Sequence, residues 1–95
     1  MITTKQRAYL RGLANKIPAL YQVGKGGVNE NFIKMINDTL EKNELIKVTV
    51  LENSGCTPRE ICGEVIAAVG AEPVQVIGNK FVIYRRSTDN PQIEL

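Results

Sequence analysis

The amino-acid sequence predicts a single α/β domain in which one helix is followed by the order β-α-β-α-β-β, with the helices packed on a four-stranded mixed sheet. Helical and strand-like periodicities alternate along the chain, and Gly78-Asn79 separates the last two strand-like runs as a two-residue hairpin turn. The 95 residues are enough for one core, and 43% hydrophobic with 23% charged residues is typical of a globular protein. We expect a domain over residues 1–86 and a polar tail over residues 87–95.

A first helix is expected over residues 3–17. Thr3 and Gln6 have the spacing of a capping box, and apolar residues recur on one side at helical periodicity. Gly12 lies in the middle, where glycine costs about 1 kcal/mol relative to alanine unless it permits close packing. Pro18 disfavours helical geometry at Ile17, so the helix should end there and a strand should follow over residues 19–23.

A glycine loop, Gly24-Lys25-Gly26-Gly27, joins this strand to the second helix. Asn29 is a favourable N-cap, and the apolar stripe that follows indicates a helix that ends near Asn43. Residues 45–51 then alternate as a strand with Ile46, Val48 and Val50 on one face.

The third helix should begin at Pro58, because Thr57 and Glu60 form a second capping-box pattern around a proline at the first helical position. Gly70 is a natural C-cap, and strands are expected over residues 74–77 and 81–84. Two strand-helix-strand crossovers of the usual right hand then give the mixed sheet. The tail should be weakly ordered unless another part of the chain holds it.

The charge is distributed unevenly, although the net charge is only +2. Residues 1–29 contain five basic residues and no acidic residue, whereas most of the acids follow in the middle of the chain. Such a basic block suggests a polyanionic partner, although a solvated surface remains the alternative.

Several kinds of chemistry are excluded by the residues that are missing. The chain has no histidine and only Cys56 and Cys62, so it cannot build a Cys/His zinc site or a histidine-dependent nucleophile. Acidic pairs such as Glu41 with Glu44 are expected on exposed helix flanks with near-normal pKa values. We therefore expect no enzyme activity, no metal and no cofactor. No run is apolar enough for a membrane span, which places the chain in the cytoplasm by default.

The glycine loop is the strongest functional signal. Gly24 and Gly27 have the Gly-x-x-Gly spacing with which KH modules clamp a nucleic-acid backbone, and Lys25 adds a positive charge at the tip. A helix N-terminus after the loop also favours a phosphate. The alternative is a tight turn that uses glycine for its geometry alone.

Whole segments of the chain resemble the bacterial stand-alone CRM domain, the YhbY-type RNA-binding proteins. They are Thr4-Lys5-Gln6, Leu10-Arg11-Gly12-Leu13-Ala14, the loop Val23-Gly24-Lys25-Gly26-Gly27, Glu44-Leu45-Ile46-Lys47-Val48, and Val74-Gln75-Val76-Ile77-Gly78 leading into Phe81-Val82-Ile83-Tyr84-Arg85. The resemblance implies a fold like the C-terminal domain of translation initiation factor 3. It also implies RNA binding through the glycine loop and neighbouring bases, and association with the precursor of the large ribosomal subunit.

The predicted function is therefore binding of structured, ribosomal RNA by a protein that acts as a monomer. The alternative is a protein-interaction module whose basic face binds an acidic protein. The candidate RNA-binding residues are Gly24, Lys25, Gly26, Gly27, Lys5, Arg11, Lys16, Lys47 and Arg85. Lys47 could instead simply occupy the outer sheet face, and Tyr84 is interpreted as a half-buried strand residue rather than a platform for base stacking.

Overall fold

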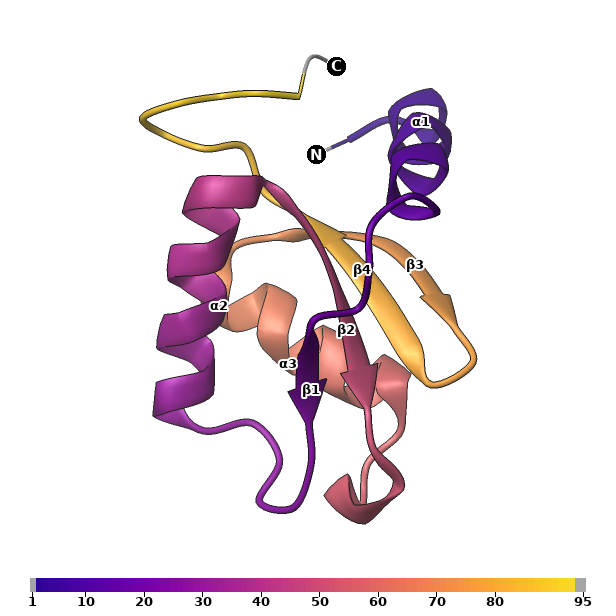
Figure 1. Ribbon diagram of the computed structural model, residues 1–95, viewed down its shortest axis with the longest axis vertical. Helices are drawn as coiled ribbons and strands as arrows, with labels where there is room; N and C mark the ends of the chain where they lie inside the picture. Colours follow the sequence, from indigo (N-terminus) through magenta and orange to yellow (C-terminus); the bar gives the residue numbers. More distant parts are fainter. Residues whose placement is uncertain (1, 94–95) are drawn as a thin grey trace.

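The computed structural model describes residues 2–93 and has the element order that the sequence predicts (Figure 1). The elements are α1 (Thr4–Ala14), β1 (Tyr21–Val23), α2 (Glu30–Asn43), β2 (Leu45–Val50), the 3-10 helix η1 (Glu52–Ser54), α3 (Pro58–Val69), β3 (Glu72–Ile77) and β4 (Lys80–Tyr84). The short helix η1 was not anticipated, because it forms within a segment that the sequence marks only as a turn.

The four strands form one mixed sheet in the order β1-β2-β4-β3. β1 runs parallel to β2, with Tyr21 opposite Val48, and β4 is antiparallel to both β2 and β3. The mixed α/β sheet is therefore confirmed, and its strand order, which the sequence left open, places β1 and β3 at the edges. Pro73 lies within β3. Proline has no N–H group to donate to a neighbouring strand, but an edge strand has a neighbour on one side only and can therefore accommodate it.

The helices form one layer on each face of the sheet. The larger apolar cluster joins α2 and α3 to one face through residues such as Ile36, Ile61 and Phe81. The smaller cluster places Leu10 and Ala14 of α1 against Val82 on the opposite face. Figure 1 shows α1 near one end of the long axis, whereas the glycine loop lies at the other end.

Local signals at the helix ends are confirmed. Thr3 and Thr57 both form capping boxes, and the side chain of Asn29 accepts a hydrogen bond from the N–H group of Phe32. Gly70 ends α3 in the left-handed conformation, with φ of +68°. These caps satisfy backbone groups that a helix end would otherwise leave without partners.

Several element boundaries differ from the predictions by one to three residues. α1 ends at Ala14 rather than Ile17, and β1 begins at Tyr21, so residues 15–20 form a connection between the two elements. A Cβ atom added at Gly12 would meet nothing within 4 Å, so this glycine does not serve close packing. β3 begins at Glu72, two residues before the expected start.

Candidate nucleic-acid interface

The glycine loop is a tight turn with Lys25 exposed at its tip. The N–H group of Gly27 donates to the carbonyl oxygen of Gly24 over 3.0 Å. Gly26 and Gly27 have φ of +96° and +63°, a region that residues with a Cβ atom rarely adopt. A Cβ atom at either position would meet no atom within 4 Å, so the space beside the turn is open to another molecule.

Gly24 has a different role, because it lets the loop approach the segment that follows β2. A Cβ atom at Gly24 would lie 3.3 Å from Oδ1 of Asn53 and 3.4 Å from Cδ1 of Leu51. The N–H group of Leu51 also donates to the carbonyl oxygen of Val23 over 2.8 Å. The glycine loop therefore lies where the parallel strands β1 and β2 end, the edge at which α/β sheets commonly bind ligands.

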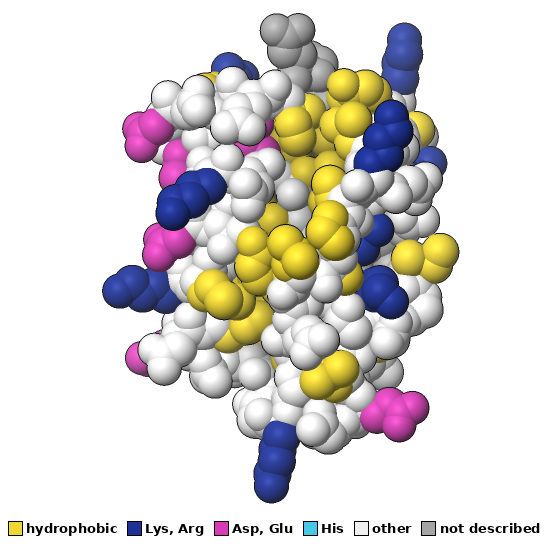
Figure 2. Space-filling model, viewed as in Figure 1, with side chains coloured by type: hydrophobic (Ala, Val, Ile, Leu, Met, Phe, Trp, Pro, Cys, Tyr) yellow, Lys and Arg dark blue, Asp and Glu magenta, His cyan; other side chains and the backbone are white. Residues whose placement is uncertain are grey.

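The predicted cations do not form one compact site. Lys5 and Arg11 belong to α1, which lies at the opposite end of the molecule from Lys25 (Figure 1). The long axis of the molecule measures 36 Å. In Figure 2, hydrophobic side chains occupy much of the middle of this face, and Asp and Glu side chains lie mainly at the left, over α2. Any ligand that reaches both α1 and the glycine loop must therefore be extended.

Lys16 and Lys47 are brought together, although 31 positions separate them in the sequence. Both line an open groove beside β1, here called the α1 groove. Its lining residues are Leu13, Lys16, Ile17, Pro18, Leu20, Tyr21, Asn43, Leu45, Ile46, Lys47 and Ile93. Lys47 pairs across the sheet with Val82, which belongs to the apolar cluster under α1. Lys47 is thus on the α1 face of the sheet.

Sequence reasoning missed Leu20 and Tyr21 as surface features of this groove. Leu20 is 70% exposed, the largest exposed fraction among the bulky apolar residues described. The sequence predicts a strand over residues 19–23, whereas the structure places Leu20 in the connection that precedes β1. The available signal was Pro18, two positions before Leu20, because proline is common in connections.

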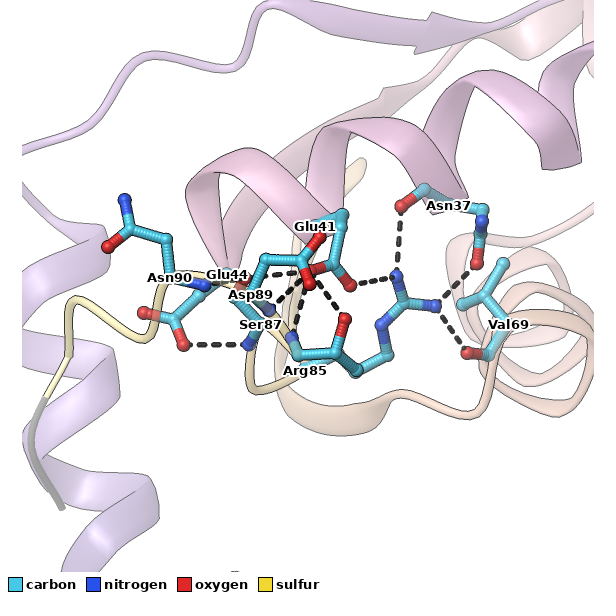
Figure 3. Close-up of polar contacts among 9 residues, drawn as sticks. Asn37, Glu41, Glu44, Val69, Arg85, Ser87, Asp89 and Asn90 are labelled. Atoms are coloured by element: carbon cyan, nitrogen blue, oxygen red, sulfur yellow. Dashed lines mark hydrogen bonds and ion pairs between the residues drawn. The ribbon is translucent and has the colours of Figure 1, made fainter.

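Arg85 has partners inside the protein (Figure 3). Its guanidinium group donates to the side chain and carbonyl oxygen of Asn37 in α2, and to the carbonyl oxygen of Val69 at the end of α3 over 2.9 Å. Glu41 lies 3.6 Å away as an ion-pair partner, and the Arg85 side chain is only 19% exposed. Arg85, which follows β4, therefore connects this strand to α2 and α3 in the folded protein. Its guanidinium group is not an exposed cation such as Lys25.

Glu41 and Glu44 hold residues 87–93, an arrangement here called the tail clamp (Figure 3). Oε2 of Glu44 accepts from the N–H group of Ser87 over 2.9 Å, and Oε1 accepts from those of Gln92 and Ile93 over 2.6 and 2.8 Å. Oε2 of Glu41 accepts four further hydrogen bonds from residues 87–89. The tail was expected to be weakly ordered unless another part of the chain holds it. Glu41 and Glu44 hold it through these hydrogen bonds. Residues 94–95 lie outside the described part.

The prediction that these carboxyl groups have near-normal pKa values is wrong. Hydrogen bonds from the hydroxyl groups of Ser87 and Thr88 lower the pKa of Glu41 to about 2. The side chain of Glu44 is 0% exposed, and its burial opposes ionisation, but the backbone N–H groups of the tail outweigh that effect and lower its pKa. The sequence predicts both carboxylates on an exposed helix flank. It could not show that the tail contacts them, because Ser87 is 43 and 46 positions away from Glu44 and Glu41.

Other expectations about single side chains can be checked directly. Tyr84 is a strand residue, as predicted, but it is only 5% exposed and therefore buried rather than half-buried. Cys62 is buried, burial raises the pKa of its thiol, and Cys56 is exposed. In residues 2–93 no group of three or more Cys, Asp or Glu side chains is arranged to hold a metal ion. None of the described helices combines the length and the apolar composition that crossing a lipid bilayer requires.

Comparison with known proteins defines the class of this domain. The model of the CRS1/YhbY (CRM) domain matches residues 2–85, so the chain belongs to the CRM-domain family. It is 44% identical to the "Probable RNA-binding protein YqeI" of Bacillus subtilis over 95 residues, which cover 100% of this chain and 99% of that protein. It is 33% identical to an "RNA-binding protein" of Haemophilus influenzae over 88 residues, or 93% and 89% of the two chains.

A solved structure supports the fold independently. The solution structure of the hypothetical protein SAV1595 from Staphylococcus aureus superposes with a TM-score of 0.78 at 48% identity. The match covers 100% of this chain and 99% of that one. Both sequence relatives carry the name of an RNA-binding protein and neither that of an enzyme, in agreement with the expectation that this chain is not an enzyme.

Proposed function

We propose that this protein binds RNA through the glycine loop and through the cationic side chains of and beside α1. The observation that carries this proposal is the exposed Lys25 at the tip of a turn where Gly26 and Gly27 leave open space. An ammonium group at such a tip can bind a phosphate while the backbone of the turn approaches the ribose chain. The names of the two relatives support RNA as the polyanion.

The distance between α1 and the glycine loop makes the proposed contact extended rather than local. An RNA that reaches Lys5 and Arg11 as well as Lys25 has to follow much of the 36 Å long axis. Lys16 and Lys47 lie beside the groove between these two ends. We infer that several phosphates are bound at once, so that affinity depends steeply on salt.

We further propose that the RNA is ribosomal and belongs to precursors of the large subunit, as the resemblance to the stand-alone CRM proteins implies. A cytoplasmic monomer is the form that we expect to act there. Cross-linking in cells, followed by sequencing of the attached RNA, tests this part of the proposal. Recovery mainly of RNAs other than ribosomal precursors would contradict it.

Lys25→Glu is the sharpest test of the loop. Lys25 is exposed and the substitution leaves the glycine turn intact, whereas a change at Gly26 would add strain at φ of +96°. Lys42→Glu is the matched control, because Lys42 is also exposed but lies on α2 beside Asp38 and Glu41. We expect Lys25→Glu to weaken RNA binding by about tenfold or more and to reduce the slope of log affinity against log salt by roughly 0.7 to 0.9 per phosphate lost.

Equal affinities of the two variants at every salt concentration would remove the glycine loop from the interface. Circular dichroism and thermal melting should be the same for both variants, so that a folding defect cannot imitate the result. The rival function, binding of an acidic protein, is tested with ribonuclease. Partners that stay bound in cell extracts after ribonuclease treatment would favour the rival.

A further inference from the structure

The α1 groove has the size and the walls of a site for a small flat ligand. Its volume is about 470 Å³, and most of its lining residues are apolar. Leu20 lines the groove and is 70% exposed. Tyr21 also contributes to the lining, but it pairs with Val48 and packs on the larger apolar cluster, so its ring belongs to the α2 and α3 face of the sheet. Figure 2 shows the hydrophobic side chains that gather over this part of the face.

Among the described residues, the charged side chains that line the groove all have the same sign. Within residues 2–93, Lys16 and Lys47 are the charged side chains that line it, and no Asp or Glu does so. Lys16 comes from the connection between α1 and β1, whereas Lys47 comes from β2, so the two ammonium groups reach the groove from different parts of the fold. A ligand that matches this arrangement has an apolar body and negative charge beside it.

Two ligands have these properties, an RNA nucleotide and an acidic amphipathic helix of another protein. Lys16 and Lys47 already belong to the proposed RNA-binding surface, and both sequence relatives are named as RNA-binding proteins. These two observations favour the nucleotide, whose phosphates would lie beside the two ammonium groups.

We propose that the α1 groove receives an unpaired RNA base, while the ammonium groups of Lys16 and Lys47 bind phosphates next to that base. This inference rests on the proposed RNA binding and adds to it that single-stranded or bulged nucleotides are preferred over a continuous duplex. A paired base cannot enter the groove, because both of its faces are covered by its neighbours in the stack. Packing against apolar side chains also tolerates any base, so the groove confers little sequence preference.

The test compares two RNA strands of equal charge. One is a short fluorescein-labelled oligoadenylate, and the other is the same strand whose central riboses lack their bases. Both are titrated by fluorescence anisotropy with the wild-type protein, with Leu20→Glu and with Ile77→Glu. Ile77 is the matched control, because it is 59% exposed and lies at the end of β3, on the opposite edge of the sheet from β1.

We expect the wild-type protein and Ile77→Glu to bind the intact strand at least about fivefold more tightly than the abasic strand. Leu20→Glu places a carboxylate at the rim of the groove and should abolish this difference. Leu20→Glu also lies beside Lys16 and Lys47, so it should weaken binding of both strands more than Ile77→Glu does. The measured quantity is therefore the ratio of the two affinities within each variant. Unchanged melting curves for the two variants exclude a folding defect.

Equal affinity of the wild-type protein for the two strands would overturn the inference. If Lys25→Glu still weakened binding in that case, the proposed function would survive without the base site. If the wild-type protein bound neither strand and no other RNA, both proposals would fall. Binding of an acidic peptide that Leu20→Glu alone abolishes, with both strands unaffected, would assign the groove to a protein partner and would also overturn the inference.

Discussion

Replacement of Glu44 by glutamine should destabilise the protein by about 2–4 kcal/mol, because the carboxylate of Glu44 joins the tail to the end of α2. Glutamine keeps the shape of the side chain but offers one acceptor oxygen. That oxygen can serve the N–H groups of Gln92 and Ile93, while the new amide group faces the N–H group of Ser87 as a second donor. A hydrogen bond to a charged group contributes about 1.5–3 kcal/mol, and a buried donor left unpaired adds to the loss.

Urea unfolding followed by circular dichroism measures this change, and Glu64→Gln is the matched control on an exposed face of α3. A loss of about 2 kcal/mol corresponds to a decrease in Tm of roughly 10 °C for a domain of this size. Hydrogen exchange then locates the effect. The amides of Ser87, Gln92 and Ile93 should lose protection first, before the amides of the sheet.

The reasoning would be refuted if Glu44→Gln and Glu64→Gln unfolded at the same urea concentration. It would also be refuted if Glu44→Gln destabilised the protein while the tail amides kept their protection. The first result would mean that the carboxylate contributes nothing to stability. The second would mean that its contribution does not pass through the tail.

Four further outcomes follow from the same structure. Arg85→Lys should cost about 1–2 kcal/mol in urea unfolding, because an ammonium group cannot reproduce the forked contacts of the guanidinium group to α2 and α3. Gly12→Ala should raise Tm, with a gain of about 0.5–1 kcal/mol from helix propensity at an open position, whereas Gly26→Ala should lower it because of its positive φ. Truncation after Arg86 should lower the stability measured at neutral pH, and the difference from the full chain should shrink between about pH 4.5 and pH 2.

Much of the fold could be predicted because its signals are local. Capping boxes, the αL residue at Gly70 and the hairpin turn each depend on residues within a few positions of one another. The end of α1 could not be placed from the sequence. Leu13 and Ile17 both pack on the smaller apolar cluster, although Ile17 lies beyond the end of the helix. An apolar period alone does not show where the hydrogen bonds of a helix stop.

The candidate site was harder to predict, since it depends on which residues meet across the sheet. The basic block identified Lys16 and Lys25, and Lys47 lies in one of the segments that resemble the family. It could not show that Lys16 and Lys47 share a groove, or that Lys25 lies at the far end of the molecule. Both facts follow from the strand order and from the position of α1 on the opposite face to α2 and α3. Arg85 was predicted as an RNA-binding residue. The sequence could not show its contacts within the protein, because the partner Asn37 is 48 positions away.

The tail clamp explains why Glu44 keeps an unfavourable backbone. Its φ is +64°, in a region that costs a residue with a Cβ atom roughly 1 kcal/mol or more, and glycine would fit there without strain. Glycine, however, has no carboxylate to accept hydrogen bonds from the tail, and it could not bring Ile93 to the apolar cluster under α1. The strain is therefore offset by the contacts that Glu44 makes with the tail.

The same carboxylates make the attachment of the tail depend on pH, and the sign of that dependence separates a clamp from a merely adjacent tail. The pKa of Glu41 falls from 4.5 to about 2 when the tail is bound, and that of Glu44 is lowered as well. A lowered pKa in the folded state stabilises it fully above about pH 4.5, and the gain disappears as the pH falls towards 2. A chain without residues 87–93 lacks the donors that lower these pKa values. The stability that the tail adds must therefore decrease in acid, whereas a tail held by apolar packing alone would add the same stability at every pH.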